Sequence, residues 1–526
     1  MLDVRLVNAN VVTMDPAHPV AREVGLWRGR IVGVDGAVSA LPARQVVDLQ
    51  RATVLPGFID AHTHLAWTGL GARTPSVAPC ARIEDVLATI EQAALAAPVG
   101  AWVDVVGYDQ RPLGRHLTAT ELDRVSAGRR IFLMHNSGHA CVVNSVVLDL
   151  LPDGVTHDNG YLAEQGAAAV RALRGPYPVD DLVDAIETAG RTCLAEGVTA
   201  AAEAGIGGGL VSHSPVELAA YLEAREQGRL PFRVQLMVAA AALRPVVAHA
   251  TDAIPRALDL GVRTGLGGDW LSIGALKVFT DGGMMARTAA LTSPYVGLDH
   301  SGQFYDDPDV LASQILDGHL AGWQLAVHAI GDRAVDVALD ALDRAHRARP
   351  RPHARHRIEH AGLVRPDQLA RFVQLGVTAV VQPNFLVYSG DDYAAIMGEE
   401  RMPWLYRGRG FLDHGVRLVG SSDRPVTAGA PLRAIQFMVE RTSESGRVVG
   451  ADEAITVDEA LRAYTVDAAH ACHWEETLGS IASGRHADLV VLADDPRRVD
   501  PARIGAIEIV STLVAGAVAH GADLLG

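Results

Sequence analysis

The sequence predicts a (β/α)₈ barrel, a TIM-type fold in which eight parallel strands alternate with helices. The chain has 526 residues, enough for such a barrel with extensions. Its middle alternates apolar, strand-like runs with segments whose apolar residues recur every three or four positions. Apolar strands between helices indicate a parallel sheet that is buried on both faces. Both ends of the chain read differently, as short strands only.

Eight segments have the apolar, β-branched composition expected of barrel strands. The first, LPGFIDAHTHL, lies at 55–65. The others lie at 197–205, 232–240, 271–282, 324–332, 356–362, 376–384 and 415–423. Helix-like periodicity lies between or after them, at 179–197, 215–228, 333–349, 366–376 and 457–471. The count and the alternation together fit the barrel.

About 130 residues separate the first predicted strand from the second, which is too many for one loop of a barrel. We therefore predict an insertion at about 67–180 that lies over the barrel mouth. It contains a helix-like segment at 84–97 and strand-like segments at 102–110 and 129–145.

The two chain ends are predicted to form one β-sandwich domain. Residues 1–55 and 480–526 consist of short strand-like runs, such as those at 4–13 and 507–526, punctuated by glycine and proline. We assign the barrel with its insertion to residues 56–479. The composite domain would then be made of two parts that are distant in sequence.

Composition and charge favour a globular protein that acts on small molecules. Hydrophobic residues make up 49% of the chain and charged residues 21%, as in proteins with a packed core. The formal charge of −16, without a long basic run, argues against nucleic acid or an anionic membrane as partner. The N-terminal stretch does not resemble a secretory signal, and no apolar run could span a bilayer. We expect a cytoplasmic protein, and a homodimer stays open as its assembly.

Side chains able to bind or bridge a metal follow five of the eight predicted strands. Any one of them alone is more typical of a core histidine, a helix N-cap or a surface lysine. Burying several polar groups around one cavity is costly unless they are paired, so their common position at strand ends indicates a metal site. These residues are His62, His64, Lys277, His328, His360 and Asp423.

The order of these residues resembles that of the metal-dependent amidohydrolase superfamily. The segments KVFTDGGMMARTAAL and HNSGHACVVNS are similar to its amidohydrolase family 3 branch, and GSIASGRHADLVVLADDP resembles the return of the chain into the β domain. The resemblance covers nearly the whole chain. It implies a hydrolase but says little about its substrate.

The resemblance also implies a two-metal centre. His62, His64 and Asp423 would bind one divalent ion, and His328 and His360 would bind a second. Imidazole and carboxylate ligands suit zinc best, with iron, manganese or cobalt as alternatives.

A carbamate on Lys277, formed with CO₂, would bridge the two ions. An ammonium group repels a dication, whereas a carbamate offers two anionic oxygens. The alternative is that Lys277 stays a simple cation and that only one ion binds.

The expected chemistry is hydrolysis by a metal-activated hydroxide. Coordination lowers the pKa of bound water from ~15.7 towards ~7. Asp423 would accept the water proton and return it to a leaving nitrogen. We assign catalytic roles to Asp423, His328 and His360.

A second group of residues is expected at the mouth of the site or in the substrate pocket. The family similarity suggests that His139 and Asn144 reach the substrate or the mouth of the site, and the alternative is a polar surface loop of the insertion. Arg287 would hold a substrate carboxylate or carbonyl, or form an ion pair with Asp281. Asp281 and Gln382, near predicted strand ends, are further candidates for the substrate pocket. Seven histidines without partners are predicted to be exposed: His18, His116, His157, His213, His300, His353 and His356.

The function predicted from the sequence is hydrolysis of a C–N bond in a small N-acyl or N-formyl amine, amide or cyclic amide. A hydroxide would also attack an ester, a lactone or an aminated ring, so these substrates stay open. A non-catalytic, ligand-binding barrel is a further alternative. An oxidoreductase is disfavoured, because neither a dinucleotide-binding fingerprint nor cysteine ligands are present.

Overall fold

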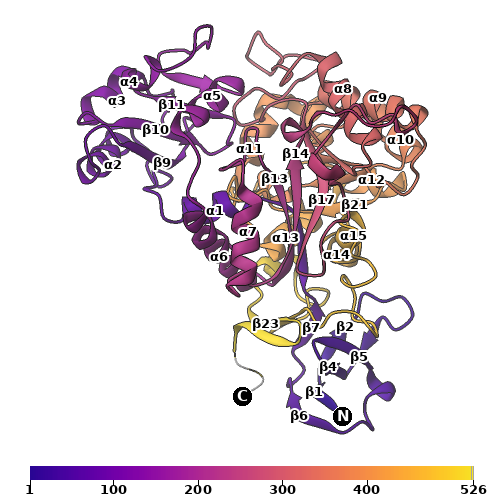
Figure 1. Ribbon diagram of the computed structural model, residues 1–526. Coiled ribbons are helices and arrows are strands. Elements are labelled where there is room, and N and C mark those ends of the chain that lie inside the picture. Colours follow the sequence, from indigo (N-terminus) through magenta and orange to yellow (C-terminus); the bar gives the residue numbers. More distant parts are fainter. Residues whose placement is uncertain (523, 525–526) are drawn as a thin grey trace.

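The structure is a computed structural model that describes residues 1–522 and 524 (Figure 1). Residues 523, 525 and 526, at the end of the strand-like run predicted at 507–526, lie outside the described residues.

The centre of the molecule is an eight-stranded parallel sheet that forms a nearly closed barrel (Figure 1). All eight predicted segments supply its strands, which follow one another in chain order and pair in parallel. Where the first and last strands meet, the amide of Asp423 donates to the carbonyl of His62 at 2.7 Å. The predicted barrel is therefore confirmed. Its strands are β8 (Phe58–Thr63), β13 (Val198–Ile206), β14 (Arg233–Ala239), β17 (Leu271–Phe279), β18 (Leu325–Ala329), β19 (Arg357–His360), β20 (Thr378–Val381) and β21 (Leu418–Gly420).

Helices cover the outside of the barrel, and α9 (Asp332–Ala348) shows why they form. Its buried residues Val335, Leu339 and Leu342 recur every three or four positions, which places them on the face that packs on the sheet. The helix predicted at 457–471 is interrupted and forms α14 (Val457–Ala463) and α15 (Val466–Ala471). The other barrel helices are α6 (Val179–Ala195), α7 (Glu217–Glu226), α8 (Pro308–Leu320), α10 (Pro366–Leu375), α11 (Pro383–Arg401), α12 (Arg409–Asp413) and α13 (Pro431–Glu440).

Strands from both chain ends share one sheet at the bottom of Figure 1, below the barrel. In that sheet β22 (Leu489–Leu492) pairs antiparallel with β7 (Thr53–Pro56), which joins the C-terminal part to the N-terminal part. The sheet order is β24 (Ala517–Gly521), β23 (Ile509–Val514), β22, β7, β2 (Asn10–Val12) and β3 (Val20–Ala21). A second sheet contains β5 (Arg30–Val34), β4 (Val24–Trp27), β1 (Leu2–Val7) and β6 (Ala43–Asp48).

The segment after β8 forms a separate layer at the upper left of Figure 1. It has a four-stranded sheet, and the strand predicted at 129–145 is split by a turn into two antiparallel strands. That turn reaches the barrel, where its residues 137–139 line the cavity described below. The first helix after β8, α1 (Leu65–Gly71), lies beside α6 at the barrel. The elements of the separate layer are α2 (Ile83–Ala96), β9 (Trp102–Tyr108), α3 (Ala119–Val125), β10 (Arg130–His135), β11 (Ala140–Val143), α4 (Ser145–Leu148), β12 (Tyr161–Ala163) and α5 (Gln165–Arg174).

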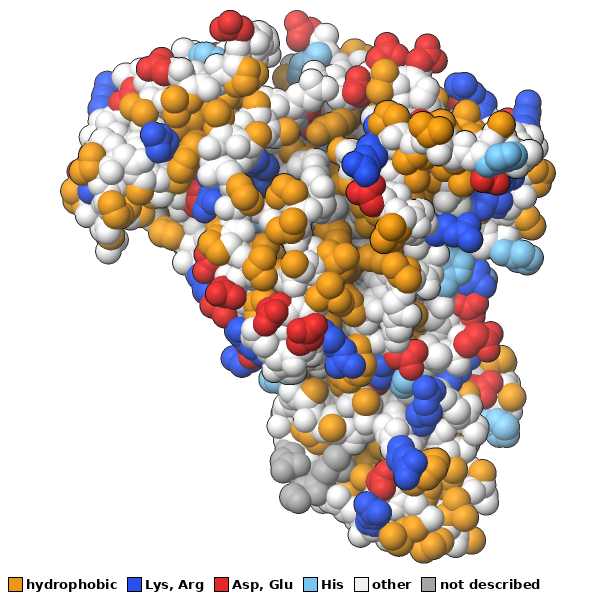
Figure 2. Space-filling model, viewed as in Figure 1, with side chains coloured by type: hydrophobic (Ala, Val, Ile, Leu, Met, Phe, Trp, Pro, Cys, Tyr) orange, Lys and Arg blue, Asp and Glu red, His pale blue; other side chains and the backbone are white. Residues whose placement is uncertain are grey.

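Acidic and basic side chains are interspersed with apolar ones over the face shown in Figure 2. No helix in the described part of the chain has the length and the apolar composition needed to cross a membrane.

Candidate metal centre

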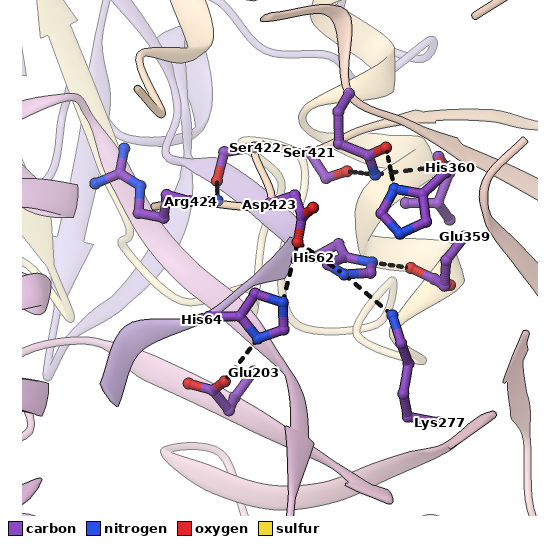
Figure 3. A network of polar contacts seen from close by, with 12 residues as sticks. His62, His64, Glu203, Lys277, Glu359, His360, Ser421, Ser422, Asp423 and Arg424 are labelled. Carbon is purple, nitrogen blue, oxygen red and sulfur yellow. Dashed lines mark hydrogen bonds and ion pairs between the residues drawn. The ribbon is translucent and has the colours of Figure 1, made fainter. Parts of the chain in front are cut away.

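Two histidines at the end of β8 point into the barrel with Asp423, which follows β21 (Figure 3). His62 and His64 lie two residues apart on a strand, so their side chains emerge on the same face. His62 Nε2 lies 3.2 Å and His64 Nε2 3.0 Å from Asp423 Oδ1, and all three side chains are buried. Within residues 1–522 and 524, this is the only trio of histidine, cysteine or carboxylate donors whose ligand atoms all lie within 4.8 Å of one another.

The other three predicted ligands line the same cavity. Lys277 Nζ lies 3.2 Å from His62 Nε2 (Figure 3). The ring centroids of His62 and His360 are 4.9 Å apart, and those of His328 and His360 are 4.5 Å apart. The structure therefore brings together all six residues predicted from the strand ends.

The chemistry of this donor set fits divalent metal ions. Two imidazoles and a carboxylate are ligands that zinc accepts. In addition, Nδ1 of His328 is buried and has no hydrogen-bond partner among the described residues. An unpaired polar atom in a buried site costs free energy unless something binds it. His62, His64 and Asp423 are thus placed to hold one ion. The structure brings His328 and His360 beside them without forming a second trio of the same kind.

Buried polar groups behind the histidines fix the orientation of their rings. Nδ1 of His62 lies 2.5 Å from Glu359 Oε2, and Arg357 donates to the same oxygen at 2.9 Å. Nδ1 of His360 lies 2.7 Å from Gln382 Oε1. A partner on Nδ1 of this kind sets the tautomer and leaves Nε2 for a ligand. Gln382 therefore acts through His360. Glu359 was not predicted, although it directly precedes His360 in the sequence.

The carboxylates of the cavity favour a cation, and burial opposes it. Burial disfavours the imidazolium form of His64, but the carboxylates of Asp423 and Glu203 outweigh this and raise the pKa of His64 to about 9. Burial lowers the pKa of Lys277 to about 8, against the opposing effect of Glu359 and Asp423. A fraction of Lys277 is then a neutral amine near pH 7. The neutral amine is the form that can add CO₂.

His139 lies at the site, and its partner is a glutamate of the same insertion. Its ring centroid is 5.3 Å from that of His328, and Nδ1 lies 2.9 Å from Glu164 Oε2. Glu164 is buried and has the backbone angles φ 49° and ψ −115°, a combination that is strained for a residue other than glycine. The turn between β10 and β11 thus presents a fixed imidazole to the metal cavity.

Asp281 and Arg287 are held by contacts within the protein, and Asp281 Oδ1 also lies 3.4 Å from His328 Nε2. Asp281 accepts hydrogen bonds from the amides of Ala290, Ile330 and Gly331 at 2.8–3.0 Å. Its carboxylate thus connects its own segment to the backbone at residue 290 and to the backbone that follows β18. Arg287 pairs with Asp392 at 2.6 Å. The predicted alternative of an Arg287–Asp281 ion pair is therefore wrong.

Asn144 does not line the cavity, which corrects the prediction that it reaches the substrate. Its Oδ1 accepts from the amide of Ile131 at 3.0 Å and its Nδ2 donates to the carbonyl of Arg129 at 2.9 Å. Both bonds lie within the insertion and join the end of β11 to the start of β10. A sequence motif cannot distinguish this internal role from substrate contact.

Three of the seven histidines predicted to be exposed are not. His213 is buried, because the loop after β13 packs against the insertion. His116 and His356 are partly buried, against Tyr161 and His319 respectively. These contacts join segments distant in sequence, so the local pattern carried no sign of them.

The metal cavity continues into an apolar space. The volume beside the six ligands is about 20 Å³, room for little more than a water molecule. A second space of about 20 Å³ adjoins it and shares His139, His360 and Asp423 with it. Its apolar walls come from Met284, Met285, Ile330, Phe385, Tyr393 and Val426.

Comparisons with known proteins agree with this geometry. The model of a family described as the amidohydrolase family matches residues 45–520. The chain belongs to the amidohydrolase family. It is a hydrolase that acts on carbon–nitrogen bonds other than peptide bonds. The family predicted from the sequence is confirmed.

Individual relatives of this amidohydrolase cover almost its full length. N-substituted formamide deformylase of Arthrobacter pascens is 30% identical over 99% of this chain and 98% of that protein. An uncharacterised metal-dependent hydrolase from Pyrococcus horikoshii superposes with a TM-score of 0.76 at 26% identity, covering 95% of this chain and 99% of that one. A second one, from Pyrococcus furiosus, has a TM-score of 0.72 at 28% identity, covering 94% and 100%. The two Pyrococcus proteins, which are described as metal-dependent hydrolases, support dependence on a metal.

Proposed function

We propose that this amidohydrolase removes the acyl group, and preferentially the formyl group, from small N-substituted amides. The observation that carries the proposal is the buried set of six strand-end residues, open on one side to an apolar space. The name of the Arthrobacter relative supports the formamide class. A formyl group is the smallest acyl group, and it suits a metal cavity of about 20 Å³.

His62, His64 and Asp423 would hold one divalent ion, for which zinc is the best match to the donors. His328 and His360 would hold a second ion, and Lys277, as a carbamate, would bridge the two. Bound there, a divalent ion lowers the pKa of a water molecule and polarises a carbonyl.

The residues of the chain supply the proton transfers and the orientation. The carboxylate of Asp423 would take a proton from the attacking water and deliver it to the leaving nitrogen. Its position is fixed from two sides, because Oδ1 contacts both His62 and His64. His139, held by Glu164, would orient the substrate from the insertion side.

The apolar space, of about 20 Å³, would take the part of the N-substituent that is next to the nitrogen. Met284, Met285 and Phe385 form part of its walls, and Phe385 lies parallel to the ring of His360 with centroids 6.2 Å apart. An apolar substituent gains about 25 cal/mol for each Å² removed from water. The enzyme should therefore prefer N-alkyl or N-benzyl formamides over formamide itself.

Metal analysis with a substrate screen tests the proposal. We expect one or two equivalents of transition metal per chain, and release of formate from N-benzylformamide. N-acetylbenzylamine, a lactone, an ester and an aminated heterocycle serve as matched substrates. The absence of transition metal, together with activity that resists chelators, would refute the metal-dependent mechanism. Faster turnover of the lactone, the ester or the heterocycle would refute the formamide assignment.

A further inference from the structure

A second cavity, of about 400 Å³, lies where the insertion meets the barrel. One wall is formed by β10 and α5 of the insertion, and the other by the loop that follows β13. In Figure 1, α5 lies on the side of the insertion that faces the barrel. None of the six predicted metal ligands lines this cavity. Its volume is within the range of small-molecule sites.

Arg171 on α5 brings an unbalanced positive charge to this cavity. Its Nε is shielded from solvent and has no hydrogen-bond partner. Its Nη2 has only long contacts, 3.4 Å to the carbonyl of Gly138 and 3.6 Å to Met134 Sδ. Among the described residues, no carboxylate lies within ion-pair distance of Arg171. The guanidinium also lies over the ring of Phe132, 5.8 Å from its centroid. A partly buried guanidinium without a carboxylate partner is costly to desolvate.

The neighbouring Arg174, unlike Arg171, has a carboxylate partner, and it serves as an internal comparison. It donates to Asp104 at 2.9 Å, and its guanidinium stacks on Tyr177 at 3.7 Å. Tyr177 donates to the same carboxylate at 2.7 Å. Both arginines line the cavity, but only the charge of Arg174 is neutralised by the protein. One net positive charge therefore faces the cavity.

A second polar group without a hydrogen-bond partner lies on the barrel side of the cavity. His213 is 8% exposed, and its Nδ1 has no hydrogen-bond partner; the nearest carboxylate oxygen, of Glu217, is 3.8 Å away. Burial, with the nearby charge of Arg171, holds the pKa of His213 well below its usual range. The ring is then neutral and can donate one N–H. Together the two side chains offer an anion a guanidinium and an imidazole.

Most of the other side chains that line the cavity are apolar, although Ser212 and Ser214 also line it. Phe132, Met134 and Ala168 belong to the insertion, and Pro176 and Tyr177 follow α5. One positive charge balances one negative charge, whereas a dianionic phosphate would leave a net negative charge beside these apolar walls. A planar carboxylate also matches the two-pronged donor geometry of arginine.

We propose that this cavity is a binding site for a small aromatic monocarboxylate, separate from the metal centre, in which the carboxylate binds Arg171 and His213. The aromatic ring packs between Phe132, Met134 and Tyr177.

The site shares a wall with the metal cavity. Gly138, whose carbonyl contacts Arg171, lines the metal cavity, as do Leu210 and Val211 of the loop that contains His213. The loop contains Gly207, Gly208 and Gly209, which have positive φ angles of 82°, 150° and 73°. A ligand bound to Arg171 in the 400 Å³ cavity would thus be separated from the metal cavity by the backbone of these shared residues.

Calorimetric titration of the metal-loaded enzyme with phenylacetate and with its neutral analogue phenylacetamide tests the proposal. We expect phenylacetate to bind at least ~10-fold more tightly, because a charge-assisted hydrogen bond is lost with the amide. In R171M this preference should disappear. A172W, which fills the cavity from an exposed position on α5, should abolish binding without changing any charge. R191M, which removes an exposed arginine of α6, is the matched control and should bind as the unaltered chain does.

A crystal structure with 4-bromophenylacetate locates the site directly. The anomalous signal of bromine should lie between β10, α5 and the loop after β13. A signal in the metal cavity alone, equal affinity for acid and amide, or no binding of either compound would overturn the proposal. Melting temperatures of the variants show whether each is folded, and A172W and R171M alter the cavity by independent means.

Discussion

The strand ends of the barrel and the insertion contribute to the metal cavity in different ways. On the barrel side, His62 and Lys277 lie on hydrogen-bonded strands, and the amide of Asp423, just past β21, donates to the carbonyl of His62. On the insertion side, a four-residue turn brings His139 to the same cavity, while Asn144, five residues later, bonds within its own sheet. The position of a residue along a barrel strand therefore predicts where its side chain lies. The position of a residue in the turn depends on how the whole insertion folds.

The largest expected effect is on the barrel side, at Asp423. We expect D423N to lower kcat by about 10²–10⁴-fold, because an amide cannot accept the water proton. The fold should persist, since the amide keeps the size of the carboxylate. Steady-state kinetics with circular dichroism checks this. Asp392, which pairs with Arg287 at a distance from the ligands, supplies the control D392N. Near-normal turnover of D423N would refute the role of Asp423.

The next effect concerns the carboxylates behind the histidines. E359Q should weaken metal binding by about 10–100-fold, because the charged partner that holds the ring of His62 is lost. E203Q is the matched variant: Glu203 lies 3.5 Å from His64 Nδ1 and also accepts from Tyr221 at 2.5 Å, so its loss should have a smaller effect. Competition with a fluorescent zinc chelator measures both affinities. Equal losses of zinc affinity in E359Q and E203Q would contradict the expectation that the shorter contact, from Glu359 to His62, contributes more to metal binding.

Much of the barrel side could be predicted because each of its residues lies near or just past the carboxyl end of an apolar strand. His328 and His360 needed no knowledge of contacts, since the carboxyl ends of parallel strands meet on one side of a barrel. Glu359 was missed because an acidic residue inside a strand has no distinctive pattern until its partner Arg357 is seen. Arg171 and His213 could not be predicted at all, because their cavity exists only where two distant segments meet.

On the insertion side, His139 should matter less than the barrel residues but more than its neighbours in sequence. We expect H139Q to lower kcat/KM by ~10-fold, about the value of one hydrogen bond to the substrate. E164Q, which keeps the shape of the partner, should give a smaller reduction. Metal content should stay unchanged in both variants, which separates positioning of substrate from metal binding. A loss of metal in H139Q would instead make His139 part of the metal centre.

The smallest effect on activity is expected at Asn144, which shares a motif with His139 but not its location. N144A removes a hydrogen bond to the amide of Ile131 and one to the carbonyl of Arg129, both buried between β10 and β11. An unpaired buried group of this kind costs about 1–3 kcal/mol, so Tm should fall by roughly a few degrees. Below that temperature kcat/KM should equal that of the unaltered chain, because Asn144 lines neither part of the metal cavity. If N144A reduced kcat/KM as much as H139Q at an unchanged Tm, Asn144 would act on the substrate. The segment HNSGHACVVNS would then predict substrate-contacting residues in the insertion, just as the strand ends predict them in the barrel.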